Sequence, residues 1–111
     1  MANAKQLRYE AEHLREQVRA KLSEAEKSTQ NAGELTKAGE GNKAKKEDQA
    51  ASRSYREALE LDKRATDADR RANELETKAA ELDRQENEIR QNAQDEINRL
   101  EQRKRELRGE Y

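Results

Sequence analysis

One stretch of the sequence has the residue types and spacing of a metal site. Glu10 and His13 stand three residues apart in "EAEH", which would place a carboxylate and an imidazole on one helical face, as in di-iron carboxylate bundles. Such a centre needs a second Glu-x-x-His motif, but His13 is the only histidine of the chain. We therefore predict a surface histidine, with no metal and no cofactor.

The sequence also lacks the combinations of residues that nucleophilic catalysis needs. There is no cysteine, so a thiolate nucleophile, a thiolate metal ligand and a disulfide are excluded. With one histidine and no cysteine, the sequence offers no recognisable set of a nucleophile, its general base and the group that orients the base. The glycine-containing stretch "GEGN" at 39–42 lacks the GxxxxGK[ST] context of a phosphate-binding loop. We predict that the protein is not an enzyme.

A basic stretch near the C-terminus, "RLEQRKRELR", is the candidate for contact with nucleic acid. Its two glutamates favour a solvated helix end, in which the basic residues complement the helix dipole. The 24 basic and 25 acidic residues of the whole chain give a net charge of -1, so the protein has no general attraction for nucleic acid or anionic lipid. The candidate nucleic-acid contacts are Arg99, Arg103, Lys104 and Arg105.

The composition favours long helices over a broad core. Charged residues make up 44% of the chain, and 17 of its apolar residues are alanine, whereas leucine, isoleucine and valine together number 13. No apolar run approaches the length of a membrane span, and the N-terminus lacks the apolar region of a signal peptide. We expect a soluble protein that is cytoplasmic or otherwise intracellular and does not bind membranes.

A first helix is predicted from about residue 4 to residue 38, with Asn3 as its N-cap. Its apolar residues follow steps of four and three, and the pattern repeats after eleven residues, which favours a nearly straight or slightly right-handed stripe. These residues are Leu7, Ala11, Leu14, Val18, Leu22 and Ala25.

A turn at 39–42 and a second helix at about 43–108 complete the predicted fold. Three of the four glycines lie within residues 33–41, and the chain has no proline, so one reversal between two antiparallel helices is expected. The second helix has a seven-residue repeat with a stutter between Ile89 and Ile97. We predict one all-α domain over 1–111, a helical hairpin or coiled coil. The predicted intramolecular seam is Ala58, Ala65, Ala72 and Ala79.

The first helix is too short to cover the whole second helix. An apolar stripe that continues beyond it in water needs a partner. Three solutions stay open: a second copy of the chain, a helix of another protein, or a break near 66–77 that turns the hairpin into a three-helix bundle. The predicted partner interface is Leu82, Ile89, Ile97, Leu100 and Leu107.

These observations predict a non-catalytic structural or adaptor protein that acts through coiled-coil association. The alternative is an accessory nucleic-acid-binding subunit that uses the basic C-terminal arm. The stretch "KAGEGNKAKKE" suggests a third class, a hydrophilic stress-protectant chain that folds conditionally.

Two parts of the sequence resemble known helical units. The stretch from Leu7 to Ala72 is similar to the helical hairpin that precedes Smr nuclease domains, with a charged first helix, a turn such as "GEGN" and an alanine-rich second helix. No Smr domain follows, so the resemblance implies the hairpin without the nuclease. The stretch "AGELTKAGEGNKAKKEDQAASRSYREALELDKRA" resembles a single tetratricopeptide helix pair through the spacing of Leu35, Gly39, Ala51, Tyr55 and Ala58, and "YREALELD" looks like its second helix.

Overall fold

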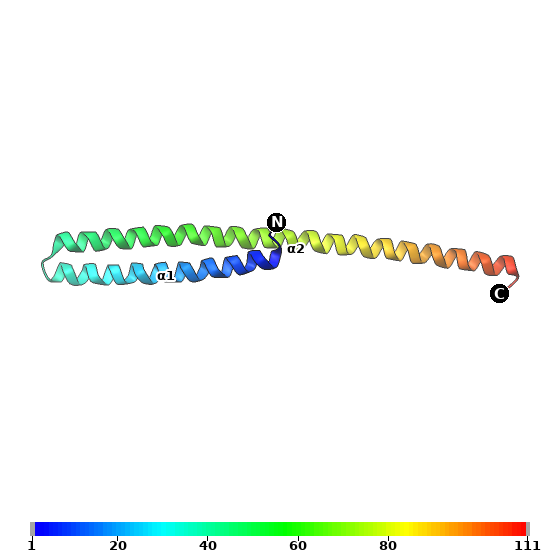
Figure 1. Ribbon diagram of the computed structural model, residues 1–111, viewed down its shortest axis with the longest axis horizontal. Coiled ribbons are helices and arrows are strands. Elements are labelled where there is room, and N and C mark those ends of the chain that lie inside the picture. The colour runs from blue at the N-terminus through cyan, green and yellow to red at the C-terminus, as the bar shows by residue number, and fades with distance from the viewer. Residues whose placement is uncertain (1, 111) are drawn as a thin grey trace. The chain divides into compact units, whose positions relative to one another are not determined.

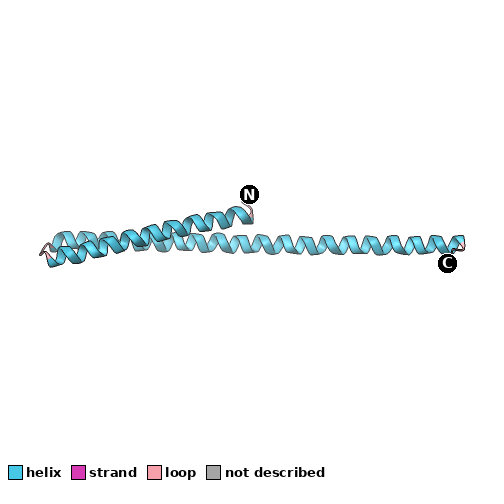
Figure 2. Cartoon of the chain, turned by 90° about the horizontal axis from the view of Figure 1, so that it is seen from below, coloured by secondary structure: helices cyan, strands magenta, loops and turns pink. Residues whose placement is uncertain are grey.

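The computed structural model describes residues 2–110, which form two α-helices and no strand (Figures 1 and 2). Helix α1 spans Ala4–Lys37 and helix α2 spans Gly41–Arg108. The two helices form an antiparallel hairpin, which confirms the predicted fold class. Every residue from 41 to 108 is helical, so the break near 66–77 required by the three-helix alternative does not occur.

The chain divides into two units, Met1–Glu74 and Leu75–Tyr111, and the single domain over 1–111 stays a prediction. The first unit holds α1 and the part of α2 that packs on it. The second unit holds the remaining residues of α2. Each unit is described by itself.

Asn3 caps α1, as its residue type predicted. Its side-chain oxygen accepts a hydrogen bond from the Gln6 amide at 2.9 Å, and its own amide donates to Gln6 Oε1 at 3.0 Å. This reciprocal capping box satisfies two amide groups that the first turn of a helix leaves without partners. The start of the first helix is therefore fixed by local chemistry.

The reversal between the helices is centred on Gly39. Its φ of 80° lies in the left-handed region, which glycine enters without the cost of a Cβ atom. The Glu40 amide donates to the Leu35 carbonyl at 2.8 Å, and the Gly39 amide donates to the Thr36 carbonyl at 3.1 Å, which is the Schellman pattern. The turn is shorter than the predicted 39–42 because one left-handed residue suffices, and Gly41 already begins α2.

The seam between the helices is built mainly of alanine. Nine of the eleven buried hydrophobic residues in the described part of the chain are alanines, and the other two are Leu7 and Leu14. On α2 five of the six buried alanines recur every seven residues. Small side chains on both helices allow the axes to approach closely. The buried alanines of α2 are Ala44, Ala51, Ala58, Ala65, Ala68 and Ala72.

Three of the four residues predicted for the intramolecular seam are buried, and the fourth is not. Ala58, Ala65 and Ala72 are at most 3% exposed, whereas Ala79 is exposed. Ala79 belongs to the second unit, in which none of the described residues, 75–110, is buried. The burial of this alanine series therefore ends at Ala72.

The buried face of α1 differs from the predicted one at its middle. The eleven-residue repeat placed Leu22 in the seam, but Leu22 is 39% exposed, and Lys21 is the partly covered residue. Burial in α1 instead follows steps of seven from Ala11 through Val18 to Ala25, which match the repeat of α2. The seven-residue period of the partner helix decides which residues meet it, even at the expense of a leucine.

Polar contacts across the seam hold the two helices in one register. The Arg15 guanidinium pairs with Asp69, and the Arg8 guanidinium lies 3.6 Å from the same carboxylate and donates to Asn73 Oδ1 at 2.7 Å. Further along, Lys21 Nζ lies 2.8 Å from Glu57 Oε2. The hydrogen bond from Lys21 holds the pKa of Glu57 below its usual value, and the pKa of Lys21 is raised in return.

Candidate helix-association surface

The second unit carries large aliphatic side chains that are open to solvent. Leu75 is partly covered, and every described residue from 76 to 110 is exposed. The five aliphatic residues predicted as the partner interface are between 48% and 71% exposed. We call them the apolar stripe: Leu82, Ile89, Ile97, Leu100 and Leu107.

The five residues of the apolar stripe lie on one face of α2. At 100° per residue, their side chains fall within a sector of about 80°. The same face also holds Ala79, Glu86, Ala93 and Lys104. The nine positions follow one another at steps of three or four residues, which is the spacing of a coiled-coil seam. The face is therefore apolar except at two charged positions, one acidic and one basic.

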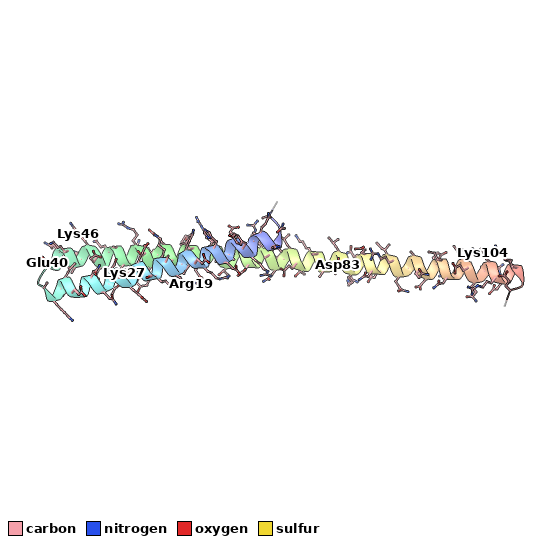
Figure 3. All side chains as sticks on the ribbon, turned by 60° about the horizontal axis from the view of Figure 1, so that its bottom comes forward. Arg19, Lys27, Glu40, Lys46, Asp83 and Lys104 are labelled. Atoms are coloured by element: carbon pink, nitrogen blue, oxygen red, sulfur yellow. The ribbon has the colours of Figure 1, made fainter. Side chains whose placement is uncertain are left out.

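The rest of the second unit is covered with charged side chains that pair along the helix. The Arg84 guanidinium contacts Glu81 and Glu88, each at 2.5 Å, and Arg90 reaches Glu86 at the stripe face. The hydrogen bond from Arg84 lowers the pKa of Glu81 and raises the pKa of Arg84. Figure 3 shows side chains projecting from the ribbon along this part of α2, where Asp83 and Lys104 are labelled. The pairs favour a solvated helix outside the stripe.

The four predicted nucleic-acid contacts share one helix segment but differ in their surroundings. Arg99 lies 3.3 Å from Glu96, and Arg103 lies 3.4 Å from Glu106. Lys104 occupies a position of the stripe face, whereas Arg105 lies in the last turn of α2. Ion pairing within the helix reduces the positive charge that two of the four residues offer to a phosphate backbone.

The predicted surface histidine is found where expected. His13 is exposed on α1, and its Nε2 lies 3.3 Å from Gln17 Nε2. Among the residues that the structure describes, no group of three or more His, Asp or Glu side chains is arranged to hold a metal ion. The same residues contain no buried polar or charged side chain. We take the apolar stripe as the candidate functional surface.

One residue of this face belongs to two predicted sites. Lys104 is part of the basic stretch predicted to contact nucleic acid, and it also stands four residues after Leu100 and three before Leu107. That spacing is the signal that places it on the stripe face. The basic residues around Lys104 favour the nucleic-acid interpretation and make its place on the stripe face easy to miss.

Within residues 2–110, neither helix contains a stretch apolar enough to be a transmembrane span. Comparison with known proteins gives no match, since no family model, no curated protein and no solved structure matches the chain. The resemblances to the hairpin before Smr domains and to a tetratricopeptide pair stay predictions.

Proposed function

We propose that the protein is a non-catalytic structural or adaptor protein, which acts by pairing the apolar stripe with another helix. The observation that carries the proposal is the exposure of all five stripe residues on one helical face. Covering a leucine or isoleucine side chain is worth about 1.5–3 kcal/mol. A partner helix with its own apolar seam would cover these side chains and gain this free energy. The stripe face fits such a helix because its positions have the three-four spacing of a coiled coil.

The first test places a charge in the stripe. The double variant Ile89→Asp and Ile97→Asp should abolish association, because burying an unpaired carboxylate costs more than the pairing of one helix face returns. Light scattering measures the mass of the pure protein, and capture from the native source compares the wild type with the variant. Asn87→Asp is the control for an added charge, since it places one negative charge about 160° around the helix from Ile89.

Two results would contradict the proposal. One is a wild-type chain that is monomeric at micromolar concentration and captures the same proteins as the double variant. The other is an equal loss of association in Asn87→Asp, which would show that charge and not the apolar stripe is responsible. Circular dichroism of each variant confirms that the helices are retained.

The alternative function, an accessory nucleic-acid-binding subunit, has weaker support. Residues 97–108 hold five basic and two acidic side chains, but Arg99 and Arg103 already face carboxylates of their own helix. Salt-sensitive binding to RNA or DNA that is lost when Arg103, Lys104 and Arg105 are neutralised would favour this alternative.

A further inference from the structure

The spacing of the stripe face reads the same in both directions from Ala93. From residue 79 to residue 107 the nine seam positions are separated by steps of 3, 4, 3, 4, 4, 3, 4 and 3. The stutter that interrupts the seven-residue repeat lies at the centre of this series. A second copy turned by 180° about Ala93 would therefore present a seam position opposite every seam position of the first.

We propose that a second copy of this chain pairs antiparallel with residues 79–107, about a two-fold axis at Ala93. This inference rests on the proposed function and names the partner helix. In this pairing Ile89 faces Ile97 of the second copy, and Ala79 faces Leu107. Ala93 faces its own equivalent, where two small side chains let the helices approach closely at the axis.

The two charged residues of the stripe face, Glu86 and Lys104, distinguish the antiparallel pair from a parallel one. In a parallel pair in register, Glu86 would face Glu86 of the second copy and Lys104 would face Lys104, so like charges would meet inside the seam. In the antiparallel pair Glu86 faces Leu100 and Lys104 faces Leu82. Glu86 then lies one helical turn from Lys104 of the other copy, within reach of a salt bridge. Charged seam residues of this kind fix orientation and register.

The charges around the seam favour the same orientation. Residues 78–89 hold four acidic and two basic side chains, and residues 97–108 hold two acidic and five basic ones. The two-fold axis at Ala93 places residues 78–89 of each copy against residues 97–108 of the other copy. A negative segment therefore faces a positive one at both ends of the pair. A parallel pair would place each segment against its own equivalent and therefore against a like charge.

The pairing uses seam positions that α1 leaves open. The buried seam alanines of α2 end at Ala72, and the antiparallel pair begins at the next position of the series, Ala79. The second copy and α1 therefore do not compete for the same residues.

Cysteine cross-linking of the full chain tests the orientation, because the natural sequence has no cysteine. Ala79→Cys and Leu107→Cys are prepared as separate single variants and oxidised in a glutathione buffer, alone and mixed. Only the mixture should form a covalent dimer, which contains one copy of each variant, since a disulfide needs Cα atoms within about 7 Å. Ala93→Cys, which lies on the axis, should cross-link to itself.

Charge reversal supplies a second test that requires no oxidation. Glu86→Lys or Lys104→Glu alone should weaken the dimer roughly tenfold, because each creates two like-charge contacts across the seam. The double variant restores both salt bridges and should regain the wild-type dissociation constant. In a parallel pair Glu86→Lys would only exchange one like pair for another and leave the affinity unchanged.

The outcomes separate this inference from the proposed function. Ala79→Cys that cross-links to itself overturns the antiparallel pair but keeps association through the stripe. A monomeric wild type that still captures a partner through Ile89 and Ile97 overturns the second copy and keeps the proposed function. A monomer that captures nothing through these residues overturns both.

Discussion

Alanine at the seam determines how closely α1 and α2 can lie. Ala65 is fully buried, and it belongs to the same cluster as Ala11, Leu14 and Ala68. A close-packed pair of helices has no room there for three additional carbon atoms. The alanines are therefore structural residues, although each contributes little apolar area by itself.

Replacing Ala65 by leucine should lower the free energy of unfolding by about 1–3 kcal/mol, because an overpacked seam forces the helices apart. Urea denaturation measures the change. Ala20→Leu is the control, since Ala20 is an exposed residue of α1, and its effect should stay within about 0.5 kcal/mol. An Ala65→Leu variant as stable as the wild type would mean that the seam is loosely packed.

At the scale of the helices, the ends of each helix were largely predictable from the sequence, because they depend on residues close to them along the chain. Asn3 indicates the start of α1, and Gly39 indicates the turn after it. The absence of glycine and proline from residue 43 to residue 108 indicates one continuous second helix. The choice between Lys21 and Leu22 was not predictable from α1 alone, because it depends on the period of the helix opposite. Lys21 can take the partly covered position because its long stem covers the seam while its charge reaches Glu57.

The residue at which the intramolecular seam ends was also not predictable from the seven-residue repeat. Ala79 continues the alanine series, so its spacing gives no sign that burial ends at Ala72. For the stripe, spacing alone indicated the face and the five aliphatic residues. The symmetry about Ala93 emerges only when Glu86 and Lys104 are counted as positions of the same face.

The glycines of the turn region should respond to alanine in opposite directions. Gly39→Ala places a Cβ atom in the left-handed region and should cost about 1–2 kcal/mol of stability, although no neighbouring atom obstructs the methyl group. Gly33→Ala adds a methyl group inside α1, also without obstruction, and should stabilise by about 0.5–1 kcal/mol. Thermal unfolding of both variants checks the pair. An equal effect of the two changes would contradict the turn geometry.

For the whole molecule, stability should differ between its two units. Residues of the first unit are held by the alanine seam and by the ion pairs of Arg15 and Lys21 with α2. Residues of the second unit have ion pairs along one helix, which stabilise an exposed helix only weakly, and none of its described side chains is buried. A helix without tertiary packing is only marginally stable in water. Pairing with a second copy would supply the missing packing.

Hydrogen exchange followed by mass spectrometry should reveal this difference. At sub-micromolar concentration the amides of residues 79–107 should exchange faster than those of residues 7–14, because the first set opens without breaking a core. Raising the protein concentration should slow exchange in residues 79–107 and leave the hairpin unchanged, since mass action favours the paired state. The Ile89→Asp and Ile97→Asp double variant should lose this concentration dependence. Protection of residues 79–107 that is strong and independent of concentration would show that a single copy stabilises this segment without a partner.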